Sequence, residues 1–361
     1  MAFDVLSVAA RFCTDGNVIS ASPFGEGHIN GTYLVRTDAG KKYTLQSINT
    51  AVFKDPCAVM NNISLVLAHL KKKITEACGD PDRECLTVVK TDDGKDLLLA
   101  ADGAYYRMYG FIEGNVYQTV EKPEHFYCAA KAFGNFQKQL SDFPAELLVE
   151  TIPHFHDTPR RLENLEKAIR EDKCGRVQEV QDEIAFARAH RDACRLVVDA
   201  IAAGEIPLRV THNDTKFNNV LLDDEGRGFC VIDLDTVMPG SMLYDFGDAI
   251  RSGATYAAED EHDLARVTVD FELFEAYTKG YLEALGDSIK PKELELLAFS
   301  GVLLTLECGM RFLTDYLEGD VYFKTHYDKQ NLYRTRSQFA LAADMEKKLD
   351  ALNAIVKKYA K

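Results

Sequence analysis

The chain has 361 residues, of which 46% are hydrophobic, and it carries a formal net charge of −15 at pH 7. This length and apolar content suffice for two domains, or for two lobes that share one site. The negative charge disfavours nucleic acid as a partner, because a phosphate backbone is bound by a basic surface, and a small-molecule partner is favoured.

The sequence also predicts where the protein is found. No apolar run that would span a bilayer is evident. The first residues, Met1-Ala2-Phe3-Asp4, place an acid where a secretory signal carries basic residues. The nine cysteines are scattered and form no C-x-x-C pair, which is typical of reduced thiols. We therefore expect a cytoplasmic protein that has no membrane partner and acts as a monomer.

Three glycines precede the first full predicted strand, in Phe24-Gly25-Glu26-Gly27-His28-Ile29-Asn30-Gly31. At Gly25 and Gly27, backbone N–H groups could approach a phosphate closely. Hairpin turns use the same residues, so the G-x-G spacing alone is weak. The position ahead of a strand favours a phosphate-covering loop, in which His28 would face a substrate or support the loop.

Short strands separated by turn residues are predicted in the first hundred or so residues. Between the second and the third strand, apolar residues recur at spacings of four and three, which predicts a helix with one face on a sheet. These helix positions are Val59, Ile63, Val66 and Leu70. The predicted strands cover residues 32–36, 42–47, 86–90, 96–100 and 105–109.

Helical periodicity dominates the remainder of the chain. We therefore expect an α+β fold with a small N-terminal lobe, residues 1–110, built on an antiparallel sheet, and a larger, mainly helical C-terminal lobe, residues 111–361. His154-Phe155-His156 is predicted as a loop, since no carboxylate or thiol is spaced to complete a metal site. Helices are predicted near residues 122–141, 159–173, 176–203, 259–285, 291–318 and 335–359.

The most informative stretch is Val210-Thr211-His212-Asn213-Asp214-Thr215-Lys216-Phe217-Asn218-Asn219, followed after a hairpin by Val231-Ile232-Asp233-Leu234-Asp235. Asp214 and Asn219 are five residues apart, and Asp233 follows an apolar run. This spacing matches the catalytic aspartate, the metal-binding asparagine and the metal-binding aspartate of kinases. Transfer of a γ-phosphoryl group from ATP requires a divalent cation against the phosphates and an oriented attacking hydroxyl.

Each residue type in this stretch suits one part of that chemistry. Asn219 and Asp233 are hard oxygen donors that suit Mg²⁺. Asp214 would accept the proton of the hydroxyl, and Lys216 would stabilise the transferring phosphate. His212 is expected to organise the loop rather than to ionise.

Ordinary turns also contain H-x-D followed by Asn, because Asn and Asp favour such positions for backbone reasons. Here the motif is accompanied by an apolar strand, a hairpin turn at residues 223–226, a second apolar strand and then Asp233. This combination favours phosphoryl transfer over a simple turn.

One part of the kinase pattern is missing. A kinase places a lysine on the strand after the glycine loop to pair the α- and β-phosphates, and the comparable position here is Gln46. Nucleotide anchoring would then depend on the metal, the loop amides or another basic residue such as Arg107. The strand 105–109 runs into residues 110–114, which resemble the hinge between kinase lobes, so adenine would bind there next to Tyr109.

Further motifs extend the pattern over nearly the whole chain. They are Ile232 to Thr236, Met238-Pro239-Gly240-Ser241-Met242, Asp245-Phe246-Gly247-Asp248, Glu307 to Leu313 and Asp315 to Asp320, together with Gly27-His28-Ile29-Asn30. Together with residues 210–216 they resemble the N-acetylhexosamine 1-kinases of the aminoglycoside phosphotransferase-like superfamily. The resemblance implies a bilobal protein-kinase-like fold, with nucleotide bound by the N-terminal lobe and sugar by the C-terminal lobe.

The resemblance also implies an activity, which is Mg²⁺-dependent phosphorylation by ATP of the anomeric hydroxyl of N-acetylglucosamine and N-acetylgalactosamine. Asp214 would be the base, and Asn219 and Asp233 would hold Mg²⁺. Gln46 fits the family pattern, so the missing lysine would be a family trait. The residues implied for the sugar site are His28, Arg251, Arg311 and Tyr322, although the last two would alternatively form a structural pair at a helix end.

Two questions stay open at this level. The closest relatives would carry an aromatic residue after Arg251, and Ser252 would loosen the sugar pocket or change the preference between N-acetylated and plain hexoses. The alternative function is that of another small-molecule kinase of the same superfamily, acting on choline, homoserine or an aminoglycoside. A nucleotide-binding protein without catalysis would be expected to lack part of the Asp214, Asn219 and Asp233 cluster, which is complete here.

Overall fold

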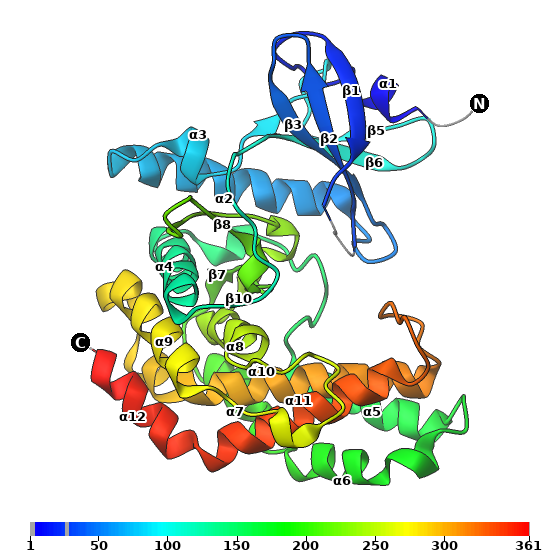
Figure 1. Ribbon diagram of the computed structural model, residues 1–361, viewed down its shortest axis with the longest axis vertical. Coiled ribbons are helices and arrows are strands. Elements are labelled where there is room, and N and C mark those ends of the chain that lie inside the picture. The colour runs from blue at the N-terminus through cyan, green and yellow to red at the C-terminus, as the bar shows by residue number, and fades with distance from the viewer. Residues whose placement is uncertain (1–3, 26–28, 361) are drawn as a thin grey trace.

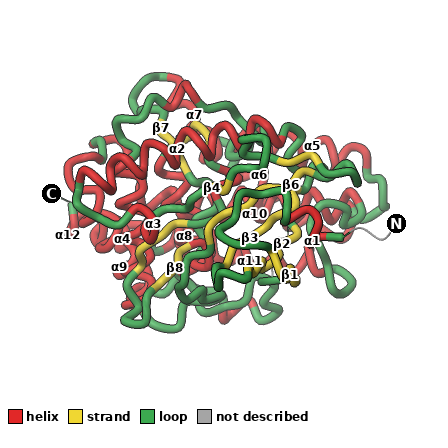
Figure 2. Tube along the Cα trace, turned by 90° about the horizontal axis from the view of Figure 1, so that it is seen from above, coloured by secondary structure: helices red, strands yellow, loops and turns green. Residues whose placement is uncertain are grey.

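The computed structural model describes residues 4–25 and 29–360. Figure 1 shows a sheet in the upper part of the molecule and a larger group of helices below it. The short first helix, α1 (Val5–Ala9), and the last helix, α12 (Leu349–Tyr359), lie on opposite sides of the molecule in this view and from above (Figure 2). The α+β class predicted from the sequence is confirmed.

The N-terminal lobe is built on a six-stranded antiparallel sheet of order β1-β2-β3-β6-β4, with β5 also paired to β6. All five predicted strands are present, although the third and fourth are shorter than expected. The first strand, Val18–Pro23, was missed, because its side chains are largely exposed and show no apolar alternation. The strands are β1 (Val18–Pro23), β2 (Gly31–Thr37), β3 (Lys42–Ile48), β4 (Val88–Val89), β5 (Leu98–Leu99) and β6 (Tyr105–Gly110).

The predicted helix after β3 is α2 (Pro56–Glu76), and the short α3 (Pro81–Glu84) follows it. Asp55 caps α2 by accepting a hydrogen bond from the N–H of Ala58, and Pro56 occupies its first turn. All four predicted apolar positions are buried. In Figure 1, α2 lies between the sheet and the helices below.

Buried polar bonds fix α2 to the C-terminal lobe. The side-chain amide of Asn62 donates to the carbonyls of Val149 and Val237, at 2.8 and 3.0 Å, and its oxygen accepts from the N–H of Val149. Apolar side chains of α2 share one core cluster with Val210 and Leu234 of the C-terminal lobe. The helix therefore belongs to both cores.

The C-terminal lobe is mainly helical and also contains two small antiparallel strand pairs, β7 with β10 and β8 with β9. Its helices are α4 (Pro123–Gln139), α5 (Thr158–Glu171), α6 (Gln181–Ala189), α7 (Leu196–Ala202), α8 (Met242–Gly253), α9 (Phe271–Leu285), α10 (Pro291–Glu318), α11 (Gln330–Lys347) and α12. The strands are β7 (Arg209–Thr211), β8 (Val220–Leu222), β9 (Gly228–Val231) and β10 (Met238–Gly240).

Several helix predictions need correction. The segment 176–203 is broken, since polar residues 190–192 separate α6 from α7. The helix expected from 259 begins only at Phe271, where Asp270 caps it by accepting from the N–H groups of residues 272 and 273. The last predicted helix is two, α11 and α12, which meet at Lys348. Helix α8 was not predicted.

Helix α10 has the length and apolar composition of a membrane span, a run that was not recognised in the sequence. Within this fold, 83% of its most apolar window is buried. It packs against α5, α8 and α11, and in Figure 1 it runs through the helical part of the molecule. We therefore assign α10 as the central core helix of the C-terminal lobe.

Candidate active site

The loop after β7 is held by a buried carboxylate on α8. The two oxygens of Asp245 accept hydrogen bonds from the backbone N–H groups of Asn213, at 2.7 Å, and His212, at 3.0 Å. Gln137 of α4 donates to the same carboxylate at 2.6 Å. Asn213 has a φ of +65°, a left-handed conformation that needs such support. Asp245 thus fixes the backbone from which Asp214 projects.

His212 also organises this loop, as predicted. Its Nε2 lies 2.9 Å from the carbonyl of Ile232, and its Nδ1 lies 3.3 Å from the backbone N–H of Asp214. A carbonyl can only accept and a backbone N–H can only donate, so the neutral tautomer protonated on Nε2 satisfies both contacts. The side chain is fully buried.

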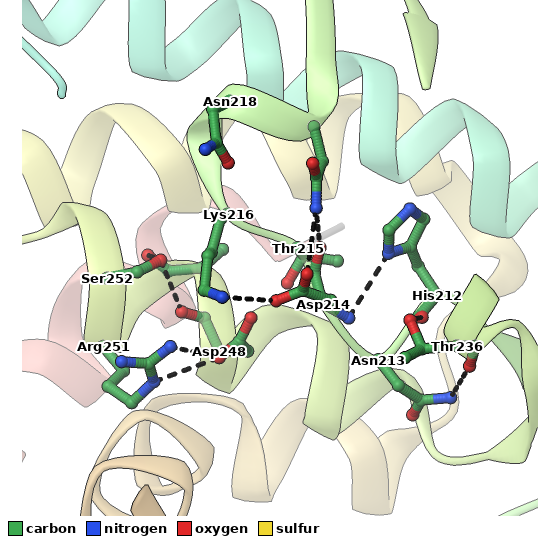
Figure 3. Close-up of polar contacts among 12 residues, drawn as sticks. His212, Asn213, Asp214, Thr215, Lys216, Asn218, Thr236, Asp248, Arg251 and Ser252 are labelled. Atoms are coloured by element: carbon green, nitrogen blue, oxygen red, sulfur yellow. Dashed lines mark hydrogen bonds and ion pairs between the residues drawn. The ribbon is translucent and has the colours of Figure 1, made fainter. Parts of the chain in front are cut away.

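Asp214, Lys216 and Asn219 are brought together, and Figure 3 shows Lys216 directed toward Asp214. Lys216 Nζ lies 2.9 Å from Asp214 Oδ1, while the side-chain amide of Asn219 donates to Asp214 Oδ2 at 3.2 Å and to the backbone carbonyl of Asp214 at 2.8 Å. Burial opposes ionisation of Asp214, but the charge and hydrogen bond of Lys216 outweigh it and hold the pKa of Asp214 below its ordinary value. The carboxylate is therefore ionised at neutral pH, as a base must be.

The predicted metal ligands are adjacent across β8 and β9. The carbonyl of Asn219 accepts a hydrogen bond from the N–H of Ile232 at 2.9 Å, next to Asp233. Asp233 is exposed and has a φ of +60°. Desolvation by the surrounding chain, with the negative charges of Asp235 and Asp214, raises the pKa of Asp233 to about 7.

These residues fit a magnesium ion. Asn219 uses its amide nitrogen for both bonds to Asp214, so its side-chain oxygen can face a cation. No three His, Cys, Asp or Glu side chains converge to form a metal site within residues 4–25 and 29–360. Mg²⁺ is commonly held by one or two carboxylates, substrate phosphates and water rather than by a full protein cage. A cation bound at this position would also relieve the repulsion between Asp233 and the carboxylates of Asp235 and Asp214.

Arg107 connects the sheet to the loop that carries Asp233. Its guanidinium donates from Nε and Nη2 to Gln46 Oε1, at 3.1 and 2.9 Å, and its Nη1 forms an ion pair with Asp235. Arg107 is 1% exposed and Asp235 4%. Asn30 donates a further hydrogen bond to Asp235. Gln46 occupies the strand position that carries lysine in kinases, and it holds Arg107 in place.

Neither Asp235 nor Asn30 was predicted as a site residue. The sequence offered a weak indication, since a charged residue within the otherwise apolar strand of Arg107 requires a partner when buried. The partner lies more than a hundred residues away. Asp235 braces the loop that carries Asp233, and its carbonyl also accepts from the hydroxyl of Thr151 at 3.3 Å.

The other residues predicted to bind nucleotide lie in different environments. Gly25 lies in the connection from β1 to β2 with a φ of +75°, and the space around its Cα is open. Gly27 and His28 lie outside the described residues. The ring of Tyr109 is buried and packs beneath the guanidinium of Arg107, 5.3 Å from its centroid, so the phenol belongs to the core.

The residues predicted for the sugar site come from two helices. Arg251 of α8 is buried and pairs with Asp248, at 2.7 Å, and with Glu259, at 3.3 Å. Ser252 turns its hydroxyl back to the carbonyl of Asp248 at 2.8 Å. Burial raises the pKa of Cys308 on α10, and the charges of Arg251 and Arg311 both act against this rise. Both arginines therefore lie near Cys308.

Arg311 lies between two aromatic rings, those of Phe155 at 5.3 Å and Phe323 at 5.5 Å. Phe323 follows Tyr322 in the loop after α10, whose N–H groups donate to the carboxylate of Asp315. Tyr322 is 56% exposed. No carboxylate lies within ion-pair distance of Arg311 in the described part of the chain, so Arg311 is not explained as half of an internal salt bridge.

His156 lies in a loop, as predicted, and is buried against the loop that carries Asp214. Its Nδ1 lies 2.8 Å from Glu307 Oε1, and its Nε2 lies 3.2 Å from the carbonyl of Asn213. Thr158 donates to the other oxygen of Glu307 at 2.7 Å. Burial opposes the ionisation of Glu307, but His156 and two nearby arginines together lower its pKa. Both ring nitrogens of His156 therefore contact buried oxygen acceptors.

We expect His156→Phe to lower the free energy of unfolding by about 3 kcal/mol, because Glu307 would lose its buried partner. Chemical denaturation measures this loss. His154→Phe is the control, since His154 is 61% exposed and its side chain pairs with Asp157 at the surface, so its loss of stability should be clearly smaller. Equal effects of the two substitutions would contradict a structural role for the His156–Glu307 pair.

A hollow of about 460 Å³ lies away from these residues, between α5 and the segment after α6. Its walls are mainly arginine, lysine and glutamate side chains, and none of the predicted site residues lines it. We assign no part of the catalytic site to it.

Comparison with known proteins agrees with this geometry. A phosphotransferase enzyme family model matches residues 20–284. The chain is similar to an aminoglycoside phosphotransferase from Alicyclobacillus acidocaldarius, with 14% identity, a TM-score of 0.62 and coverage of 97% of this chain and 95% of that chain.

Two other solved structures show the same likeness. An amicoumacin kinase in complex with AMP-PNP and Ca²⁺ has 13% identity, a TM-score of 0.62 and coverage of 95% and 92% of the two chains. A microcompartment-associated aminopropanol kinase has 15% identity, a TM-score of 0.60 and coverage of 97% and 98%. At such identities the likeness shows the fold, and the predicted kinase-like fold is confirmed.

Proposed function

This chain belongs to the phosphotransferase enzyme family and is a small-molecule phosphotransferase, and we propose that it transfers the γ-phosphoryl group of ATP to the anomeric hydroxyl of N-acetylglucosamine and N-acetylgalactosamine. The observation that carries this proposal is the arrangement of Asp214, Lys216 and Asn219 beside Asp233. The proposal of a sugar as the acceptor rests on the resemblance stated above and on the charges around Arg311.

In the proposed mechanism, Asp214 orients the attacking hydroxyl and accepts its proton. An anomeric hydroxyl is more acidic than an ordinary alcohol, so a carboxylate with a lowered pKa can serve, and orientation supplies much of the effect. Lys216 lies against Asp214, and its ammonium group can stabilise the negative charge that develops on the transferring phosphoryl group. Asn219 and Asp233 would hold Mg²⁺, which neutralises phosphate charge when bound.

Arg107 is the proposed contact between the N-terminal lobe and the nucleotide phosphates. Gln46 and Asp235 already hold its guanidinium near the metal-binding loop. An arginine offers five N–H donors in a fixed plane, so it can keep these contacts and still donate to an oxygen of the phosphate chain. Gly25 and the glycine loop would supply backbone N–H groups.

On the side of Arg161 and Arg311, the charges favour a neutral sugar over an amine. Arg161 and Arg311 lie close enough that burial and the charge of Arg311 together lower the pKa of Arg161. Neither arginine has a carboxylate within ion-pair distance among the residues described. A cationic acceptor such as choline or an aminoglycoside would be repelled here, whereas ring hydroxyls and an acetamide carbonyl can accept from Arg311 and Tyr322.

The test is ADP release from ATP and Mg²⁺ across a panel of acceptors, with phosphorus NMR of each product. The panel comprises N-acetylglucosamine, N-acetylgalactosamine, glucose, galactose, choline, homoserine and kanamycin. We expect an N-acetylhexosamine 1-phosphate, with no activity after EDTA treatment until Mg²⁺ is restored. Activity confined to an amino alcohol or an aminoglycoside would leave the phosphotransferase mechanism in place and overturn the proposed sugar substrate.

A further inference from the structure

A carboxylate next to the catalytic pair has one oxygen without a partner. Asp248 of α8 is only 8% exposed at its side chain. Its Oδ1 accepts from both Nε and Nη2 of Arg251, at 3.0 and 2.7 Å. Its Oδ2 is buried and has no hydrogen-bond donor in the described part of the structure. Buried polar atoms are nearly always hydrogen-bonded, so this oxygen requires an explanation.

The position of Asp248 points to the acceptor site. The residue lies one turn along α8 from Asp245, which holds the catalytic loop. The pKa of Lys216 is raised first by Asp214 and further by Asp248, so both carboxylates lie near the same ammonium group. Figure 3 shows the carboxylate of Asp248 between the guanidinium of Arg251 and the Lys216–Asp214 pair.

Within residues 4–25 and 29–360, no side chain supplies the missing donor. Lys216 is directed to Asp214 Oδ1 at 2.9 Å, and the guanidinium of Arg251 binds Oδ1 of Asp248 and Glu259. Ser252 donates to the backbone carbonyl of Asp248 rather than to its side chain. A carboxylate oxygen can only accept, so whatever completes this site must carry an O–H or N–H group.

We propose that Asp248 determines acceptor specificity by accepting a hydrogen bond, through Oδ2, from an O–H or N–H group next to the hydroxyl that becomes phosphorylated. The inference rests on the proposed function, in which that hydroxyl is directed to Asp214. For an N-acetylhexosamine phosphorylated at C1, the neighbouring donor is the acetamide N–H at C2. The residue thereby selects acceptors with vicinal donor groups.

The substitution Asp248→Asn separates this role from folding. An asparagine keeps one oxygen for the guanidinium of Arg251 and replaces the free acceptor with an NH₂ group. We expect kcat/KM for N-acetylglucosamine to fall about 10- to 100-fold, mainly through KM, since one hydrogen bond to a charged group is lost. For 2-O-acetylglucose, which keeps the acetyl group and lacks the N–H, the variant and the wild type should differ by less than about threefold.

Asp199→Asn is the matched control, because Asp199 pairs with Arg195 on the surface at 3.0 Å and is 55% exposed. This substitution should leave kcat/KM unchanged for both substrates. The wild type alone gives an independent measurement if Asp248→Asn folds poorly, since it should prefer N-acetylglucosamine over 2-O-acetylglucose by 10-fold or more.

The outcomes separate this inference from the proposed function. Wild-type turnover of N-acetylglucosamine without discrimination against 2-O-acetylglucose overturns the role of Asp248 alone, and so does an equal loss of both substrates in Asp248→Asn. The first result would leave ordered water as the partner of Oδ2. Absence of wild-type turnover with every hexosamine overturns the proposed function and this inference with it.

Discussion

Replacing Asp214 with asparagine should lower kcat by about two or more orders of magnitude while the acceptor still binds. The carboxylate is the group that would take the proton of the attacking hydroxyl, and an amide cannot do so. The surrounding geometry should survive the change, because Asn219 also bonds to the backbone carbonyl of residue 214 at 2.8 Å, and Asp245 holds the loop through the N–H groups of residues 212 and 213.

Steady-state kinetics and calorimetric titration of the acceptor measure the two parts of this prediction separately. Asp199→Asn serves again as a control for the chemical change at a surface site. Turnover near the wild-type level would remove Asp214 from the role of base. Loss of acceptor binding together with kcat would indicate that Asp214 positions the substrate in the ground state as well.

Replacing Arg107 with methionine should lower the free energy of unfolding by about 3 to 5 kcal/mol. Asp235 would keep its negative charge in a position that is 4% exposed and would lose the only cation paired with it in the described residues. The Gln46 oxygen would lose two donors at the same time. We also expect KM for ATP to rise, because the proposed phosphate contact is removed and the loop carrying Asp233 is less well supported.

Denaturant unfolding measures the change in the free energy of unfolding, and initial rates at varied ATP concentrations measure KM for ATP. The double variant Arg107→Met with Asp235→Asn should recover part of the stability, since no buried charge is then unpaired, without recovering KM for ATP. Arg11→Met is the matched control, because Arg11 pairs with Asp92 at the surface, where the two side chains are 53% and 49% exposed, and it should leave the free energy of unfolding close to the wild-type value. Equal losses for Arg107 and Arg11 would contradict a buried anchoring role.

Local sequence patterns were sufficient to predict much of the fold and the centre of the site. The turn residues between strands marked the sheet, and the spacing of Val59, Ile63, Val66 and Leu70 identified α2. The proximity of the candidate site residues could be predicted because Asp214 and Asn219 are near in sequence and a single hairpin brings Asp233 next to them. In these cases the structure depends on contacts between residues that are close together in the sequence.

The remaining parts depend on contacts between distant segments. Helix α8 was missed because Asp245-Phe246-Gly247-Asp248 combines acids and a glycine, which disfavour a helix on their own. Tertiary packing overrides this preference, since Gly247 allows α8 to approach the carbonyl of Ser300 on α10. Likewise, no spacing rule links Arg107 to Asp235, or His156 to Glu307, so their pairing required the fold.

The core cluster that α2 shares with the C-terminal lobe has a consequence for how the molecule responds to stress. Side chains from β3 and α2 lie in the same cluster as Phe136 of α4, Val210 of β7 and Val237, and Asn62 adds buried hydrogen bonds to the same boundary. Separation of the lobes would expose this apolar surface to water. The two lobes are therefore thermodynamically coupled, and the chain should melt as one cooperative unit rather than lobe by lobe.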